Sequence, residues 1–185
     1  MLNRRHFAAA MVALIAFPAV ASAQNAMPSA SQIERRLEAA PQRQLRRDQR
    51  VTVREFKRRP ELRRMAPSID IQAINFEFGS AEVPYSQYGK VEQIANAVER
   101  LLRRRPHTRI LIEGHTDAVG SAQSNQILSE RRAESMKRVL AREFRIPPYV
   151  LETVGYGEEY LLIQTQEENW QNRRVTLRRI DDFLR

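Results

Sequence analysis

The spacing of apolar residues between positions 69 and 180 switches repeatedly between two periods, and this constrains the fold more than any single motif. Apolar residues at every second position indicate a half-buried strand, whereas apolar residues three and four positions apart indicate an amphipathic helix. The segment 69–83 alternates, with one slip of phase, and predicts a strand. The segment 85–104 has helical spacing and predicts a helix that Pro106 stops.

The later segments extend this pattern. The run 109–115 predicts a second strand, 122–143 a second helix, and 150–157 and 173–180 two further strands. The order βαβαββ predicts an α+β fold, a two-layer sandwich in which two helices pack on one small mixed sheet. In the second helix we expect the following residues to be buried: Ile127, Leu128, Met136, Val139 and Leu140.

Residues 1–23 have the three-part plan of a secretory signal peptide. Basic residues precede an apolar run over 7–20, and Ala21-Ser22-Ala23 provides the small-x-small ending. We expect cleavage before Gln24 and no retained anchor, since the run is shorter than the roughly 20 residues that cross a bilayer. The adjacent Arg4-Arg5 also fits a twin-arginine signal, so the export route stays open.

The charge and the absence of cysteine narrow the class of protein. A formal net charge of +9 would ordinarily suggest nucleic acid, but export to the periplasm favours anionic lipid headgroups, acidic glycans or the carboxylates of cell-wall peptides. Without cysteine there is no disulfide framework and no lipid-attachment residue, so a hydrophobic core must stabilise the chain. A length of 185 residues favours one ordinary domain, expected at 67–185, with extra sequence before it.

Residues 24–66 are expected to form a short helix and an Arg-rich extension. Ser31 and Glu34 make a capping box that predicts a helix from Ser31. The stretch 43–64 is dense in arginine and poor in apolar residues, so we interpret it as a solvated spacer and not as part of a core. A periplasmic scaffold, in which this basic stretch binds an anionic surface or a protein partner, remains the alternative.

Charged residues within the segment 114–133 predict a ligand site at the edge of the sheet. Asp117 follows the second strand, and Asn125 and Arg132 lie on nearly the same face of the next helix. A carboxylate and a guanidinium across a gap complement the ammonium and carboxylate of an amino acid. On spacing alone, an internal ion pair between Asp117 and Arg132, or a solvated helix face that carries Arg131, is the simpler interpretation.

The segment 114–133 reads G-H-T-D-x-x-G and then N-x-x-L-S-x-x-R-A. This pattern resembles the OmpA-like peptidoglycan-binding domain, found in outer-membrane protein A, peptidoglycan-associated lipoprotein and flagellar stator proteins. The resemblance extends over residues 68–180 and includes NFEFGSAEV from Asn75, VGYGEE from Val154 and NRRV from Asn172. It implies the same βαβαββ fold and non-covalent binding of the meso-diaminopimelate residue of the wall peptide.

The resemblance also implies roles for particular residues. Asp117 would receive the ammonium of the ligand and Arg132 its carboxylate. Thr116 and Asn125 would help line the site, and the backbone of Gly79, Ser80 and Ala81 would close the opposite wall. Gly79 stands where the family commonly has Asp, so we expect the affinity from that wall to be altered. The tether to a membrane is expected to be an envelope protein partner or the Arg-rich extension.

Catalysis and metal binding are not expected. His115, Thr116 and Asp117 could suggest metal ligands, but His107 is the one other imidazole after residue 23 and cysteine is absent. No serine, histidine and acid grouping has a supporting motif, so a wall hydrolase is disfavoured. His115 is expected to hold the loop through hydrogen bonds. We therefore predict a non-catalytic module without cofactor in the periplasm, associated with the cell wall or outer membrane.

Overall fold

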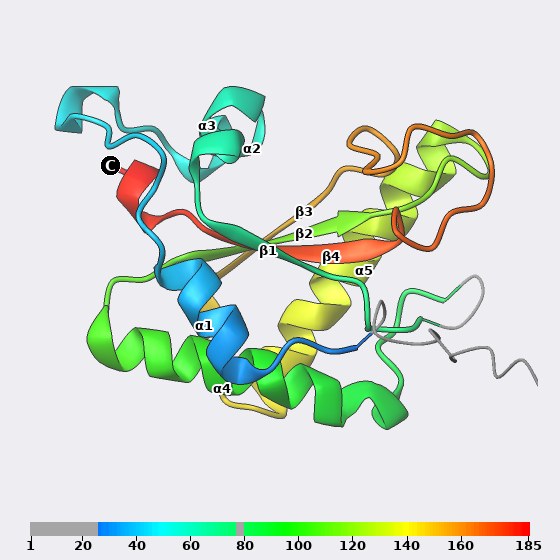
Figure 1. Ribbon diagram of the computed structural model, residues 1–185, viewed down its shortest axis with the longest axis horizontal. Coiled ribbons are helices and arrows are strands. Elements are labelled where there is room, and N and C mark those ends of the chain that lie inside the picture. Colours follow the sequence, from blue (N-terminus) through cyan, green and yellow to red (C-terminus); the bar gives the residue numbers. More distant parts are fainter. Residues whose placement is uncertain (1–25, 77–79) are drawn as a thin grey trace, which may run out of the picture.

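The computed structural model describes residues 26–76 and 80–185 (Figure 1). The predicted signal peptide and Gly79 lie outside the described residues. The helices are α1 (Ala30–Glu38), α2 (Val53–Lys57), α3 (Pro60–Met65), α4 (Tyr88–Arg104) and α5 (Ala122–Arg142), with short 3-10 helices η2 (Arg47–Gln49), η3 (Tyr85–Gln87), η4 (Pro148–Val150) and η5 (Asp181–Phe183). The strands are β1 (Ser68–Ile71), β2 (Ile110–His115), β3 (Leu151–Gly155) and β4 (Arg174–Arg179).

The strands form one mixed sheet in the order β1-β4-β2-β3. β2 pairs in parallel with β3, and α5 provides the crossover that two parallel strands require. β4 lies between β1 and β2 and is antiparallel to both, with Leu177 opposite Ile69 on one side and Ile112 on the other. The predicted α+β fold with one small mixed sheet is confirmed.

The first strand is shorter than predicted. Its pairing with β4 runs from Ser68 to Ile71, and the predicted strand segment beyond Ile71 has no ladder among the described residues. The reason is that Ile71 already pairs with Val175, one residue from the start of β4 at Arg174, so the chain past Ile71 has almost no partner strand left. It crosses instead toward α5, where the backbone N–H of Val83 donates to Ser135 Oγ at 3.1 Å.

One face of the sheet is covered by α4 and α5, whose apolar residues share a core with alternate residues of the strands, Ile110 and Ile112 among them. α1 packs in the same layer, on the side of the sheet where Figure 1 shows α4. The predicted helix near Ser31 is present but begins at Ala30, because Ser29 is the N-cap and forms its capping box with Gln32. Glu34 is thereby left to pair with Arg104 of α4 at 2.9 Å.

The other face of the sheet is covered by the Arg-rich extension, so the prediction of a solvated spacer is wrong. In Figure 1, α2 and α3 lie on the opposite side of the sheet from α4. Phe56 and Leu62 are buried there in a second core, against Leu111 of β2 and Phe183 of η5. The physical reason is that β2 is buried along its whole length, so residues such as Leu111 that point away from α4 require a second cover.

A buried ion cluster joins this extension to the sheet. Glu113 of β2 is fully buried and accepts hydrogen bonds from Arg63 of α3, the shortest at 2.8 Å, and from Arg178 of β4, the shortest at 2.6 Å. The guanidinium of Arg63 lies 3.8 Å from the ring centroid of Tyr156 and 4.1 Å from that of Tyr160. Both guanidiniums therefore share one carboxylate, and Arg63 is also held by aromatic faces.

The cluster keeps Glu113 charged. Burial by itself raises the pKa of a carboxyl group, but the neighbouring His115 ring, the charge of Arg178 and the hydrogen bonds from Arg178 and Arg63 outweigh it, so the pKa of Glu113 is lowered. Arg178 also donates to the backbone carbonyls of Arg63 at 2.6 Å and Ala66 at 3.3 Å, which satisfies the end of α3. The extension is therefore an integral layer of the fold.

We predict that Arg63→Ala destabilises the protein by about 3 kcal/mol, because it removes one partner of a buried ion pair and the contacts with two tyrosines. Arg64→Ala, in the same helix but exposed, is the matched control and is expected to change stability by less than about 0.5 kcal/mol. Urea unfolding of both variants measures this difference. Equal effects would show that Arg63 does not link the layers.

The cost of Arg63→Ala is expected to depend on pH. Because the pKa of Glu113 is lowered from its ordinary 4.5 in the folded state, the stabilisation from the charged form is present above that pH and lost as the pH falls below it. The difference in unfolding free energy between wild type and Arg63→Ala should therefore shrink under acid conditions. A difference that stays constant from neutral pH to well below pH 4.5 would contradict the ionic role of Glu113.

Candidate functional site

The candidate site lies where α5 meets the ends of β2 and β3. Gly114 is the last residue but one of β2 and Gly155 is the last residue of β3, and a Cβ on either residue would overlap Ser129 of α5. Ser129 Oγ accepts a hydrogen bond from the N–H of Gly157 at 2.8 Å and donates one to the carbonyl of Gln126 at 2.8 Å. The backbone of α5 therefore packs directly against the backbone of the strand ends.

This close packing decides which face of α5 is buried. Asn125, Ser129 and Arg132 point inward, whereas Ile127 is 43% exposed. The predicted burial of Ile127 is therefore wrong, and small or polar residues take the inner positions because the strand ends leave no room for a large side chain. Leu128 is half-buried, and the other apolar residues predicted to be buried in this helix are buried: Met136, Val139 and Leu140.

Asp117 lies in the loop between β2 and α5. Gly120 in this loop has a φ of +101°, a conformation that favours glycine, and Ser121 caps the helix, so the chain turns within a few residues. Asp117 Oδ2 accepts from Arg173 at 2.9 Å, and Oδ1 accepts from the N–H of Val119 at 3.4 Å. Among the residues that the structure describes, its ion-pair partner is Arg173, so the simple pair between Asp117 and Arg132 is not formed.

Arg132 is only 9% exposed but has no carboxylate within 4 Å among residues 26–76 and 80–185. Its Nε donates to the carbonyl of Ser80 at 3.4 Å, and its guanidinium lies 4.8 Å from the ring centroid of Phe76. Burial lowers the pKa of Arg132, and the charge of Arg173 lowers it further, while Asp117 raises it. A buried cation without a counter-ion is unfavourable, so this position favours an anionic group.

Asn125 and Thr116 form the wall beside Asp117. The amide of Asn125 lies within hydrogen-bond distance of the carbonyls of Asp117 and Val119, at 3.3 and 3.2 Å, and of the Glu158 carboxylate at 2.6 Å. Its nitrogen is thus engaged in fixing the loop. The N–H of Thr116 donates to the carbonyl of Gly157 at 2.9 Å, and its buried hydroxyl has no hydrogen-bond partner in the described part of the chain.

The opposite wall is described only in part, since Gly79 lies outside the described residues. Ser80 contributes the carbonyl that accepts from Arg132, and Ala81 follows it, half-buried. The structure thus brings Asp117, Asn125 and Thr116 together on one side and Ser80 with Arg132 on the other.

Sequence reasoning did not assign Arg173 or Phe76 to this site. Arg173 bridges Asp117 and Glu168, the latter at 2.5 Å, from the loop just before β4. The signal in the sequence that could have indicated Arg173 is the pair of arginines in NRRV. The second, Arg174, is buried and donates to Asp70 at 3.3 Å, while the first, Arg173, lies just outside the strand.

His115 does not hold the loop through hydrogen bonds as predicted. Its ring is buried and stacks on Tyr156 at a centroid distance of 5.8 Å, and neither ring nitrogen has a hydrogen-bond partner among the described atoms. Nε2 lies 3.7 Å from Glu113, too far for a hydrogen bond. Burial lowers the pKa of His115, which favours a neutral ring.

Two pockets of about 480 and 490 Å³ lie elsewhere, and both are lined in part by the Arg-rich extension. One lies between α2, α3 and Arg185. The other lies between α2 and the end of β3 and includes Tyr156 and Tyr160. Neither contains Asp117 or Arg132, so these charges, and not a deep cavity, define the candidate site. In the described residues no group of three His, Cys, Asp or Glu side chains could hold a metal ion, and no helix is long and apolar enough to cross a bilayer.

With this geometry in place, comparison with known proteins assigns the class. A sequence model of the OmpA family matches residues 75–175, more than half of the chain, and the chain belongs to this family. The matched region includes the candidate site and excludes the extension over 43–66.

Individual relatives agree with the family. Outer membrane porin F of Pseudomonas aeruginosa is 35% identical over 104 residues, which cover 55% of this chain and 29% of the porin. The peptidoglycan-associated lipoprotein of Pseudomonas putida is 42% identical over 73 residues, which cover 38% of this chain and 43% of the lipoprotein. The chain thus spans less than half the length of either relative, and both names place the family in the cell envelope.

A solved structure supports the fold alone. The periplasmic domain of Helicobacter pylori MotB, residues 97–256, superimposes with a TM-score of 0.51 at 20% identity, and the match covers 60% of this chain and 79% of that one.

We predict that Gly114→Ala destabilises the protein by about 1–3 kcal/mol, because the new methyl group would overlap the backbone of Ser129 and force α5 away from the strand ends. Gly89→Ala is the matched control: nothing lies within 4 Å of its added Cβ and it stands inside α4, so it should be neutral or stabilising by up to about 1 kcal/mol. Thermal unfolding of the two variants compares them. Similar stabilities would contradict the close packing at Gly114.

Proposed function

We propose that this protein binds peptidoglycan without catalysing a reaction, through the meso-diaminopimelate residue of the stem peptide, and that it does so in the periplasm after removal of residues 1–23. The observation that carries the proposal is the state of Arg132, a buried guanidinium that has no carboxylate partner among the described residues and feels the charge of Asp117. The name of the peptidoglycan-associated lipoprotein relative agrees with this ligand.

The chemistry follows from the two charges. The far end of the diaminopimelate side chain carries an ammonium and a carboxylate on one carbon atom. The carboxylate would pair with Arg132, whose remaining N–H groups have no acceptor among the described residues. The ammonium would bind Asp117, whose Oδ1 accepts one long hydrogen bond from the described residues, at 3.4 Å.

Arg173 is expected to weaken and tune this contact. It already occupies Oδ2 of Asp117, so the ammonium must share the carboxylate with a guanidinium or displace it toward Glu168. Each charge-assisted hydrogen bond contributes about 1.5–3 kcal/mol, and two such contacts suggest micromolar to millimolar affinity for one ligand unit. The repeated ligand along a polymer would strengthen attachment without new contacts.

A binding role is favoured over wall hydrolysis. His115 is buried, stacked on Tyr156 and without a hydrogen-bond partner in the described part of the chain, so it is not placed to activate a nucleophile. The charged groups that remain, Asp117, Arg132 and Arg173, are suited to hold a zwitterion.

We predict that Arg132→Gln and Asp117→Asn each weaken meso-diaminopimelate binding by about 10- to 100-fold, since each removes one charge-assisted contact. Arg131→Gln removes the same charge one position earlier from an exposed side chain and should leave the affinity within about twofold. Calorimetric titration with meso-diaminopimelate and with a diaminopimelate-containing muropeptide measures all four proteins, after a check that each is folded.

Several outcomes would contradict the proposal. Absence of binding by wild type, or equal binding by folded Arg132→Gln and Arg131→Gln, would mean that the site charges serve the structure only. Turnover of the muropeptide during the titration would favour a hydrolase instead.

A further inference from the structure

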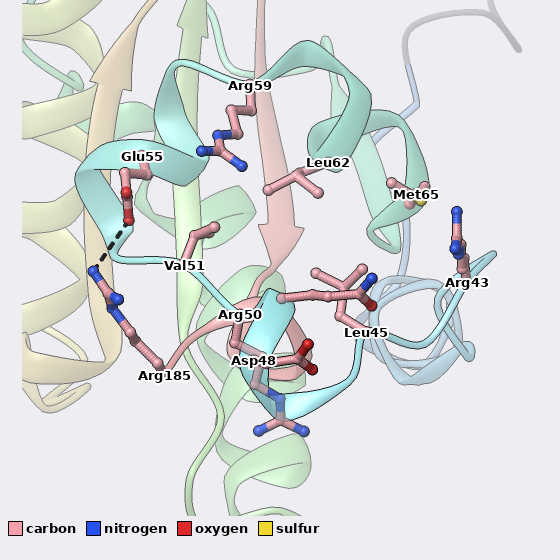
Figure 2. Close-up of a pocket in the computed structure, with 11 residues that line it drawn as sticks. Arg43, Leu45, Asp48, Arg50, Val51, Glu55, Arg59, Leu62, Met65 and Arg185 are labelled. Carbon is pink, nitrogen blue, oxygen red and sulfur yellow. Dashed lines mark ion pairs between the residues drawn. The ribbon is translucent and has the colours of Figure 1, made fainter.

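The extension encloses a pocket that lies outside the region matched by the family. It has a volume of about 480 Å³ and opens between α2, α3 and the last residue of the chain (Figure 2). It does not include any residue of the candidate site described above. Its lining includes charged and apolar side chains: Arg43, Leu45, Asp48, Glu55, Arg59, Leu62, Met65 and Arg185.

Two exposed arginines of this pocket have no carboxylate partner among the described residues. Arg43 and Arg59 are exposed, and neither forms an ion pair or a side-chain hydrogen bond there. In the view of Figure 2, the side chains of Leu62 and Met65 lie between their guanidiniums, but Leu62 is buried in the second core and Met65 is half-buried. The pocket therefore presents two separate cations with little exposed apolar surface between them.

The carboxylates of the same pocket are already engaged. Glu55 accepts hydrogen bonds at 2.8 Å from both the backbone N–H and the hydroxyl of Thr52, and it pairs with Arg185 at 3.6 Å. These Thr52 bonds lower the pKa of Glu55, with smaller contributions from the charges of Arg185 and Arg59. Asp48 lies 3.5 Å from Arg46. Arg43 and Arg59 are thus left without a carboxylate at ion-pair distance among the described residues, although the charge of Arg59 acts on Glu55.

The extension carries more exposed arginines than exposed acids. Besides Arg43 and Arg59, the exposed arginines are Arg46, Arg47, Arg54, Arg58 and Arg64, of which Arg54 and Arg58 line the other pocket, and the exposed acids are Asp48 and Glu61. Leu45 and Met65 pack against the second core but stay half-buried at this pocket. A ligand for this face must carry several negative charges spread over an area.

We propose that this face binds the phosphate headgroups of an anionic lipid surface, with separate phosphates at Arg43 and Arg59 and the half-buried Leu45 and Met65 facing the adjoining glycerol carbons. Guanidiniums recognise phosphate by paired hydrogen bonds, and basic residues near an anionic membrane each contribute to attraction. A soluble phosphate would meet one of these charges at a time, whereas a lipid surface presents many phosphates to all of them at once, and so a lipid surface is the better fit. The proposal does not depend on the function assigned to Asp117 and Arg132.

The test is co-sedimentation of the mature chain with phosphatidylcholine vesicles and with vesicles that also contain phosphatidylglycerol. The double variant Arg43→Gln/Arg59→Gln should bind the anionic vesicles about 30-fold more weakly than wild type, which is about 2 kcal/mol at roughly 1.4 kcal/mol per factor of ten. Both side chains are exposed and unpaired, so the variant should unfold at the wild-type temperature. Binding of wild type should weaken as salt is raised.

A control of equal charge separates the pocket from net charge alone. Arg103→Gln/Arg142→Gln removes two exposed arginines from α4 and α5, and it should lose less than about threefold in affinity. Equal losses of vesicle affinity in the two double variants would show that net charge, and not this pocket, determines binding. Equal binding to both kinds of vesicle would show that the lipid charge is not recognised and would overturn the proposal. Binding to neither kind would also overturn it and would favour an acidic protein partner. Binding of inorganic phosphate as tight as that of vesicles, at matched ionic strength, would overturn the lipid assignment.

Discussion

The buried carboxylate of Glu113 is the interaction on which the two halves of the fold depend. It lies on the central strand β2, and it accepts hydrogen bonds from one arginine of the extension and one of the last strand. Taking three charges out of water is costly, and the cost is offset only because the geometry is bidentate and Arg63 also lies between two tyrosines. The cluster therefore specifies where the extension docks, while the apolar contacts around Phe56 provide most of the stabilisation.

Much of the fold could be predicted because the relevant signals are local. The apolar run in β2, the alternation in β4 and the helical spacing in α4 each depend on neighbours within a few positions. The approach of Asp117 to the face of α5 that carries Arg132 followed from helical geometry and the end of one strand. These predictions needed no knowledge of distant parts of the chain, which is why they agree with the structure in kind and nearly in boundary.

The rest depended on partners far away in sequence. Arg63 reads as one more arginine in a charged stretch until Glu113, fifty positions later, gives it a buried partner. Asp117 was expected either to be available to a ligand or to pair with Arg132. Its partner in the structure, Arg173, is 56 positions away. Ile127 has the helical spacing typical of a buried face, but Gly114 and Gly155 let α5 approach the strands with Ser129 inward instead. In each case packing against a distant element overrode the local pattern.

The central position of β2 also has a mechanical consequence. Asp117 and Glu113 belong to the same continuous stretch of chain, roughly 13 Å apart at about 3.3 Å per residue. A pull applied at Asp117 would travel along β2 in tension, and the hydrogen bonds to β3 on one side and β4 on the other would resist in shear, all loaded together. Such an arrangement resists rupture far better than a strand peeled off one bond at a time. The Glu113 cluster would then pass the load to the extension, away from the helical layer.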